Sequence, residues 1–432
     1  MNRRSFLKLP TLLPLIDFGS AFHSEPHHFQ YESVIGTSMD LVVCSPSSRV
    51  AEGACQTVRE EIDRLASILD TRDPTSEISR LEHSPGDRTA SWELSEVLTA
   101  YDYWQRRTGG VFSIRSGGAD TPRNVDALGK AYILDRAAAA ARKEWPSIDA
   151  LLLDIGGDIV TWGRSAEVAI ADPGAWYDNA QPVATIDLQN RAVATSGTYA
   201  RGTHLTDSRS GQSQRTSVAA TVVAPDAVTA NALATTLCLT SADYGLQLVE
   251  STPGAEALRI DSGVLLRTSG FALLERQSPA QAPASTSWPP GYHVTITLPL
   301  TASRSSKRPY VAVWVEDSSG KLVRVLAIWA GKSKYYSDLS TLWARLHGNF
   351  GQFRSVTRAT RSPGKYDFVW DGLDNDHKPV PLGEYRITVE TNQENGGYAK
   401  QTGTITLGSS PASITLPATT NFDAVTVQYG PT

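Results

Sequence analysis

The feature that most constrains the fold is a change of sequence texture near residue 276. Before this point, apolar residues recur at helical spacing between β-branched runs, whereas after it short segments alternate apolar and polar residues. The intervening segment, residues 276–290, is crowded with Pro, Ala and Ser and has no apolar repeat, which is typical of a linker. We therefore expect two domains, which a length of 432 residues also favours.

The first domain, residues 28–275, is expected to mix helices and strands. Apolar residues three or four apart predict amphipathic helices over 51–69 and 94–104. The β-branched runs at 166–172 and 217–224 predict strands. Because the two kinds of element interleave along the chain, we expect a mixed α/β or an α+β fold.

The second domain, residues 291–408, is expected to be all-β. Segments such as YHVTITLPL, KYDFVWDG and GEYRITVET alternate apolar and polar residues and are separated by turn signals. A helical pattern of comparable strength occurs only at 339–346. This pattern predicts a β-sandwich of the immunoglobulin-like type. The remaining residues, 409–432, are assigned to a C-terminal tail.

The N-terminal residues 1–27 have the form of an export signal. Consecutive Arg3 and Arg4 precede Phe6 and Lys8, and the short apolar section LPTLLPLIDF follows. This is the twin-arginine type of signal, which predicts export to the periplasm or to the extracytoplasmic side of a membrane. A merely basic start is the alternative, and no A-x-A cleavage site is visible.

Composition excludes several classes of protein. The hydrophobic fraction of 41% and charged fraction of 20% are those of an ordinary globular protein. A net charge of -5 gives no basic footprint, which argues against a nucleic-acid partner. Beyond the leader no apolar run approaches the ~20 residues of a membrane span. Three cysteines do not make a disulfide framework, although one bridge stays open.

Two neighbouring segments are suited to a phosphate-bearing ligand. NVDALGKAYILD, residues 124–135, predicts a helix that presents Lys130, and DIGGDIVTWG begins at Asp154. Lysine supplies a compact positive charge for a phosphate. Gly156 and Gly157 let a backbone turn approach a ligand closely.

Seven sequence blocks occur in the order shown by the ApbE flavin transferases, which move the FMN half of FAD onto a protein threonine or serine. They are IGTSMD (35–40), SEISRLE (76–82), LGKAYILD (128–135), DIGGD (154–158), TSGTYAR (195–201), HLTDSRSG (204–211) and NALATT (231–236). Because so many blocks match in order, the chain resembles this family over roughly residues 30–275. The resemblance implies a T-fold-type α+β domain.

The resemblance also implies a Mg²⁺ site. It would use a main-chain oxygen at Gly129 and the side chains of Asn231 and Thr235, which one helix turn places on the same face. The family has Asp where this chain has Asn231. Asn offers a hard oxygen without charge, so we expect weaker Mg²⁺ binding here, unless Asp126 is recruited. The alternative is that these residues only pack a helix against a sheet.

By the same resemblance, His204 is the base that deprotonates the acceptor hydroxyl, and Asp207 orients that site. A surface-loop histidine is the alternative. The FAD-binding candidates are Met39, Glu77, Lys130, Asp135, Asp158, Ser196 and Thr198. Glu77 could equally be a solvated helix end, and Asp135 a charge on a helix face.

The chain departs from the family pattern at Glu82 (usually Asn), GGVFSIR over 109–115 (usually GGxFDPT), Ser208 (usually Pro) and Asn124 (often Asp), besides Asn231. The main hypothesis is therefore a Mg²⁺-dependent FAD:protein FMN transferase. Two alternatives remain, namely a non-catalytic FAD-binding or redox module and a hydrolase that converts FAD to FMN and AMP.

The second domain has its own motifs. WDGLDNDHKPVPLGEYRI, residues 370–387, resembles the signature of an uncharacterised domain of predicted periplasmic proteins. The segment 355–364 is similar to a degenerate acceptor sequence of the transferases, which makes Thr360 a candidate acceptor in the same chain; a polar hairpin loop is the alternative. The acceptor partner is thus either a separate flavoprotein or this domain. Asp371, Asp374 and Asp376 lack the order of a calcium loop and favour a tight turn.

Overall fold

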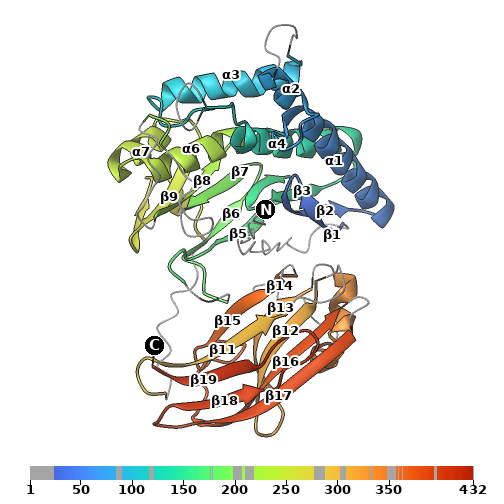
Figure 1. Cartoon of the computed structure of the whole chain (residues 1–432), viewed down its shortest axis with the longest axis vertical. Helices are drawn as coiled ribbons and strands as arrows, with labels where there is room; N and C mark the ends of the chain where they lie inside the picture. The colour runs from blue at the N-terminus through green and yellow to red at the C-terminus, as the bar shows by residue number, and fades with distance from the viewer. Residues whose placement is uncertain are drawn as a thin grey trace. The chain divides into compact units, whose positions relative to one another are not determined.

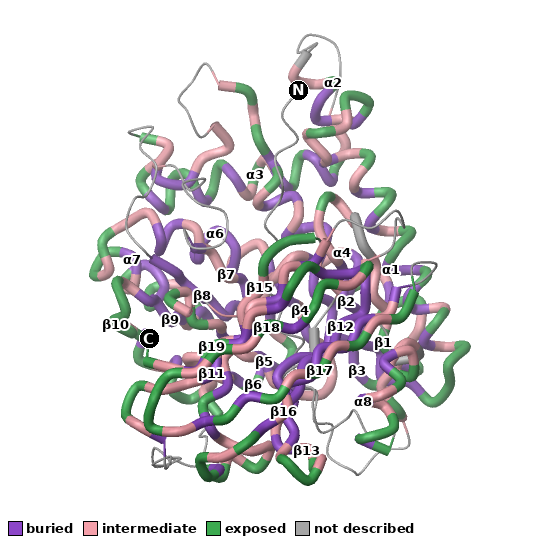
Figure 2. The backbone as a smooth tube through the Cα atoms, turned by 60° about the horizontal axis from the view of Figure 1, so that its bottom comes forward, coloured by how far each residue is buried: buried purple, intermediate pink, exposed green. Residues whose placement is uncertain are grey.

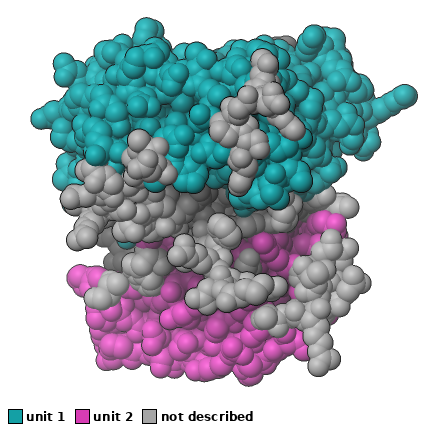
Figure 3. All heavy atoms as spheres, turned by 45° about the horizontal axis from the view of Figure 1, so that its top comes forward, with its two compact units in different colours: residues 1–9, 16–174, 184–276 teal, residues 10–15, 175–183, 277–432 magenta. Residues whose placement is uncertain are grey.

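The chain folds into two compact units, which are described separately. The described residues of 16–174 and 184–276 form the first unit, and those of 175–183 and 277–432 form the second (Figure 3). The computed structural model describes residues 24–83, 90–115, 121–175, 177, 179–197, 207–209, 218–276, 288–301, 308–330, 333–347, 357–358, 360–361, 363–393 and 397–431.

The first unit is built on an eight-stranded sheet in which all neighbours are antiparallel. In spatial order its strands are β1 (Glu25–Val34), β2 (Thr37–Ser45), β3 (Ala150–Ile155), β4 (Asp158–Trp162), β7 (Ala192–Gly197), β8 (Val218–Ala224), β9 (Glu256–Asp261) and β10 (Val264–Arg267). A separate hairpin pairs β5 (Ala166–Ile170) with β6 (Ala184–Leu188).

Helices interrupt the strands twice. Between β2 and β3 run α1 (Ser48–Leu69), α2 (Glu77–His83), α3 (Trp92–Arg107) and α4 (Asp126–Glu144); between β8 and β9 run α6 (Ala227–Leu239) and α7 (Ala242–Glu250). A short helix, η1 (Phe271–Leu273), follows β10. Each half therefore runs strand–strand, helices, strand–strand, and the helices cover one face of the sheet (Figure 1). The expected α+β fold is confirmed, with the expected helices present as α1 and α3.

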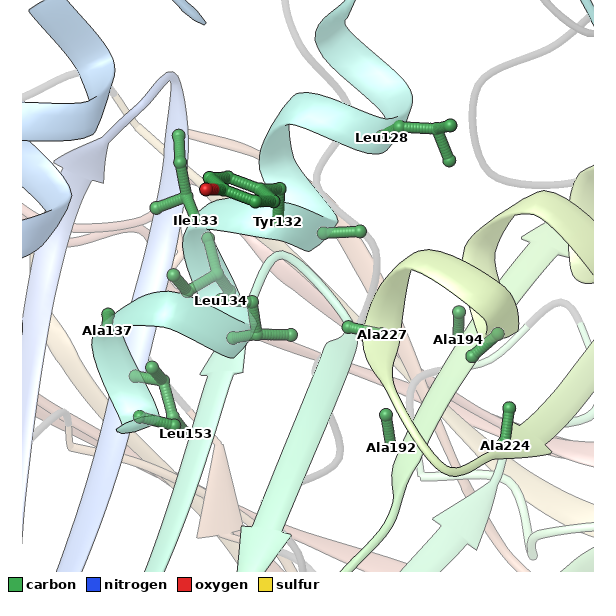
Figure 4. Packing of buried hydrophobic residues seen from close by; sticks show 14 of the residues in the cluster. Leu128, Tyr132, Ile133, Leu134, Ala137, Leu153, Ala192, Ala194, Ala224 and Ala227 are labelled. Atoms are coloured by element: carbon green, nitrogen blue, oxygen red, sulfur yellow. The ribbon is translucent and has the colours of Figure 1, made fainter. Parts of the chain in front are cut away.

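Small residues bring α4 and α6 close to this sheet. Along α6, most side chains are Ala or Thr, and the strands beneath present Ala192, Ala194 and Ala224. Figure 4 shows these alanines opposite the α6 start, with Leu134 and Leu153 filling the space under α4. All seven residues of β8 are buried, as the tube in Figure 2 shows. A helix packed this closely holds its polar side chains in fixed positions.

Asp135 of α4 fixes the N-terminus of α6. Each of its carboxylate oxygens accepts a hydrogen bond from the Ala227 backbone N–H at 3.0 Å, and Oδ2 accepts another from Val228 at 3.4 Å. A carboxylate at a helix start complements the helix dipole and satisfies N–H groups that have no partner inside the helix. Burial nevertheless raises the pKa of Asp135 to about 7, with a smaller contribution from the nearby Asp226 carboxylate.

The second unit is a β-sandwich, as expected. One sheet has the order β15 (Gly364–Trp370), β11 (Tyr292–Leu300), β19 (Val425–Pro431) and β18 (Ala412–Leu416); the other has β14 (Thr357–Arg358), β13 (Leu322–Trp329), β12 (Tyr310–Asp317), β16 (Gly383–Gln393) and β17 (Gly397–Leu407). Alternate residues of β11 and β12, such as Ile296 and Val313, meet in one core. The opposite face of β12 is covered by η2 (Ser333–Asp338) and α8 (Ser340–Arg345), with Trp314 against Leu342.

The WDG and GEY residues of the second unit are structural. Trp370 is fully buried and makes edge-to-face contacts with Trp288 and Tyr385. The Tyr385 hydroxyl donates to the Pro381 carbonyl at 2.6 Å, which is the tyrosine-corner contact of immunoglobulin-like sandwiches. Asp374 accepts from the backbone of Asp376 and Lys378, so a turn accounts for the acidic residues here.

Two segments belong to the sandwich that the sequence pattern did not assign to it. The expected tail forms β18 and β19, and β19 hydrogen-bonds to both β11 and β18. The described residues of 175–183, inserted between β5 and β6, also group with this unit. There the Asn179 amide donates to the Val369 carbonyl at 2.7 Å and accepts from the Val369 N–H at 2.8 Å, which satisfies backbone groups on the outer side of strand β15.

No helix within the described ranges combines the length and the apolar character needed to cross a membrane. Cys44, Cys55 and Cys238, all inside those ranges, are buried and are not joined by a disulfide.

Two glycines of the first unit allow the cost of backbone strain to be distinguished from the cost of a steric clash. Gly163 and Gly263 both have positive φ, +84° and +86°. An added Cβ would lie 2.1 Å from the Asp149 carbonyl oxygen at Gly163 but would meet nothing within 4 Å at Gly263. We expect Gly263→Ala to cost about 1 kcal/mol, and Gly163→Ala roughly 2 kcal/mol more. Equal urea midpoints for the two variants, followed by far-UV circular dichroism, would contradict this.

Asp135 should make stability depend on pH. Its folded pKa of about 7 lies above the ordinary 3.8, so the folded state holds a proton that the unfolded state has released between these values. Stability contributed by this group therefore falls as pH rises from about 4 to 7. Asp135→Asn removes the titration, and relative to wild type the variant should gain about 2 kcal/mol between pH 5 and pH 7.5. Urea unfolding at both pH values measures this; parallel pH profiles would exclude it.

Candidate active site

Three polar side chains from separate elements meet at one end of the first sheet. Lys130 of α4 forms an ion pair with Asp158 at the start of β4, with 2.6 Å between Nζ and Oδ2. Asn231 of α6 donates from Nδ2 to the same Asp158 oxygen at 3.0 Å. Asp158 and Asn231 are only 2% and 8% exposed, whereas Lys130 is partly exposed. Because bulk water is largely excluded around Asp158, its ion pair with Lys130 and its hydrogen bond with Asn231 are both stronger than they would be at the surface.

A glycine turn places Asp158. Gly156 and Gly157 have φ of +63° and +93°, the pair of positive values that a two-residue hairpin between β3 and β4 requires. A Cβ on Gly156 would lie 2.7 Å from the Thr37 hydroxyl oxygen, so this position also lacks room for a side chain. The turn is closed by Asp154, whose Oδ1 accepts from the Gly157 N–H at 2.8 Å.

The orientation of the Asn231 amide leaves its oxygen available. Since a carboxylate offers acceptors to its neighbours, the amide nitrogen must face Asp158. Oδ1 is buried and has no hydrogen-bond partner among the described residues. One turn later, Thr235 Oγ1 lies 3.2 Å from Ser196 Oγ at the end of β7. Mg²⁺ binds hard oxygen ligands such as amide carbonyl and hydroxyl oxygens. The unpaired Asn231 oxygen and the hydroxyl group of Thr235 therefore fit this ion.

No group of three or more acidic, histidine or cysteine side chains in the described part of the chain could hold a metal ion. Amide, hydroxyl and main-chain oxygens would therefore have to contribute. Gly129, the expected main-chain ligand, is buried in α4 next to Lys130.

Two further carboxyl groups lie behind the site. Asp40 of β2 pairs in register with Asp154 of β3, and both are buried. Burial, reinforced by Asp40, raises the pKa of Asp154 well above its usual range. Asp154 Oδ2 has no hydrogen-bond partner within the described residues. An acid inside an apolar strand run, as in LLLDIGG, is the sequence signal for this layer.

The other predicted site residues contact the backbone, lie buried in a strand, or fall outside the described residues. Both oxygens of Asp135 bind the α6 backbone, and Glu77 accepts from the Ser91 N–H at 2.6 Å near the start of α3. Met39 is fully buried in β2. His204 and Thr198 lie outside the described residues. Roles of these residues toward FAD or an acceptor stay predictions.

Asp207 lies beside the segment 109–111. The Ser208 N–H donates to the Val111 carbonyl at 3.3 Å, which joins the block after His204 to the GGVFSIR block. The Asp207 carboxylate itself accepts from the Arg209 backbone at 2.9 Å and forms an ion pair with its guanidinium at 2.7 Å.

Two departures from the family pattern contact each other. Glu82 lies 3.8 Å from the guanidinium groups of Arg115 and Arg123, and it accepts from the Arg123 N–H at 3.3 Å. The acid at position 82 is therefore matched by the base at 115. Asp126, the alternative metal ligand, accepts instead from the Thr71 hydroxyl at the start of α4.

Solved structures of similar fold support the first unit's architecture. The ApbE protein of Thermotoga maritima has 21% sequence identity and a TM-score of 0.51, covering 59% of this chain and 100% of that protein. The flavin transferase ApbE from Vibrio cholerae has 17% identity and a TM-score of 0.50, covering 58% and 99%. At these identities the likeness establishes the fold alone. None of the curated proteins compared with the sequence matches it.

Family models match both units. The model described as "Predicted periplasmic protein (DUF2271)" matches residues 291–424 of the sandwich. The model described as "ApbE family" matches residues 35–121 and 118–259 and so spans the Lys130, Asp158 and Asn231 cluster. Because that match extends over more than half of the chain, this protein belongs to the ApbE family.

Proposed function

We propose that the protein transfers FMN from FAD to a threonine or serine hydroxyl of an acceptor protein and releases AMP, in a Mg²⁺-dependent reaction. The observation that carries the proposal is the meeting of Lys130, Asp158 and Asn231 beside the Ser196–Thr235 pair. In this cluster the Lys130 ammonium group can contact a phosphate, and the Asn231 amide oxygen and Thr235 hydroxyl can bind a cation. Pyrophosphate binding requires both kinds of group at one place.

In the proposed reaction, the acceptor hydroxyl oxygen forms a bond to the FMN-side phosphorus of FAD. The bond from that phosphorus to the bridging oxygen breaks, and AMP leaves with the bridging oxygen. The hydroxyl proton passes to His204, the predicted base. Lys130 is positioned to hold a phosphate oxygen, because its ammonium group is partly exposed while Asp158 fixes its direction.

The metal ligands would be the Gly129 carbonyl, the Asn231 amide oxygen and the Thr235 hydroxyl. When bound, Mg²⁺ would neutralise charge on the pyrophosphate. The part of the protein itself is to hold these oxygens on buried, closely packed α4 and α6.

We further propose that the protein acts in the periplasm after twin-arginine export, and that the sandwich docks to, or is, the flavin-carrying redox partner. Support comes from Arg3 and Arg4 in the leader and from the family description matched by the sandwich.

AMP release distinguishes transfer from its two rivals. Purified protein with FAD and Mg²⁺ should release AMP over many turnovers only when an acceptor with the D-x-x-[ST]-G-A-[ST] sequence is added, and chelation should abolish release. Release of many equivalents of AMP without an added acceptor would indicate hydrolysis of FAD, because modification of Thr360 in the same chain releases at most one equivalent. Absence of release under both conditions would indicate an FAD-binding or redox module.

His204→Asn should lower the transfer rate by about 10²–10⁴-fold while FAD still binds, because it removes the general base. His347→Asn is the matched control, since His347 is exposed on the second unit and its left-handed φ of 48° suits asparagine. Equal rates for the two variants, measured by AMP release, would remove His204 from the reaction.

Thr360 is the second candidate acceptor. It is half-buried, its carbonyl accepts from Arg308, and the neighbouring Arg361 guanidinium lies over the rings of Trp329 and Tyr366. Cationic neighbours would favour the phosphodiester of an attached FMN. A linker can raise the effective concentration of such an acceptor to about millimolar.

If Thr360 is modified in the same chain, mass spectrometry after incubation with FAD and Mg²⁺ should find FMN on its peptide. The adduct should vanish in Thr360→Ala but persist in Thr415→Ala, an exposed threonine of β18. An unmodified Thr360 peptide in a protein that modifies an added acceptor would leave Thr360 as part of a polar loop.

A further inference from the structure

We propose that Asp158, an acid that the family pattern shares, orients Asn231 so that the amide oxygen faces the cation, and that it supplies the negative charge beside this uncharged ligand. The inference rests on the proposed function, because it concerns how this chain holds Mg²⁺ with an uncharged residue in the place of an acidic ligand.

The first step is the orientation of Asn231. Its Nδ2 donates to Asp158 at 3.0 Å, and both side chains are buried, so rotation of the amide would bring two acceptors together. The amide oxygen is therefore fixed on the side away from Asp158, where it lacks a hydrogen-bond partner among the described residues. Leaving such an oxygen unpaired is costly, and a cation would relieve that cost.

The second step is the charge count. Lys130 and Asp158 form a neutral ion pair, to which Asn231 adds no charge. An Asp at 231 would place a second carboxylate against Asp158, close to Asp154, whose own pKa is already raised by burial. Two buried like charges at hydrogen-bond distance repel strongly. The Asn231 amide avoids this repulsion and leaves Asp158 as the acid that faces Lys130.

The third step is the consequence for the metal. A carboxylate that acts through an intervening amide is farther from the cation than a direct ligand. Affinity should be lower than for a directly coordinating Asp, because ligand charge tunes divalent-cation affinity. Asp158 is thus a positioning residue, and its removal should abolish the Mg²⁺ response even though Asn231 and Thr235 remain.

The test uses the full-length protein and MgCl₂ alone, with thermal unfolding as the readout. Wild type, Asp158→Asn, Asn231→Asp and the double exchange are compared. Asn190→Asp is the control because it makes the same change at an exposed turn of the same unit. Without metal, each single variant should lose roughly 5 °C in Tm, and the double exchange should lose less than the sum.

With MgCl₂, the upward Tm shift of wild type should disappear in Asp158→Asn and return in the double exchange. The return should need roughly tenfold less Mg²⁺ than wild type, since the carboxylate would then coordinate directly. Asn231→Asp should show a larger Mg²⁺ shift than wild type, because the ion separates two acids. Asn190→Asp should respond as wild type does.

A wild-type Mg²⁺ response in Asp158→Asn, or a double exchange as unresponsive as that single variant, would overturn the inference. Failure of the proposed function looks different: wild type would then release no AMP in the acceptor assay, whatever the Tm series shows. A wild type whose Tm is insensitive to MgCl₂ would overturn both the metal role and the positioning role of Asp158.

Discussion

The burial of the Asp158 carboxylate is the constraint on which the site depends. A carboxylate that is 2% exposed is strongly unfavourable unless it is paired, and its two partners come from two different helices. Lys130 on α4 and Asn231 on α6 must both be in place before the penalty is relieved. Assembly of the site and docking of the two helices are therefore one event.

Two of the departures from the family pattern, Glu82 and Asn231, have chemically complementary neighbours. Glu82 faces Arg115, and Asn231 faces Asp158, so in each case one altered position has a complementary neighbour. Loss of a function would leave altered residues without such matching. The pairing thus favours a site that has been rebalanced around its ligands over one that has decayed.

Local patterns anticipate much of the fold but little of the pairing within it. The spacing of Val58, Ile62 and Leu65 predicts α1, because a helix face is a local property. Contact between Asp158 and Asn231 joins residues 73 apart, and it follows from strand order and helix packing, which local patterns do not encode. Likewise, β18 and β19 follow turn-rich sequence at residues 408–411 and 417–424, which resembles a C-terminal tail. Local patterns therefore do not predict that these strands belong to the sheet.

The position of β19 bears on how the sandwich forms. β11 opens this domain along the chain, yet one of its edges is completed only by β19 at the other end. Until that late strand arrives, β11 has backbone groups open on that side and available to any other extended chain. Closure of a strand pair over so long a stretch of chain is expected to make the sandwich fold more slowly than a domain built from local contacts.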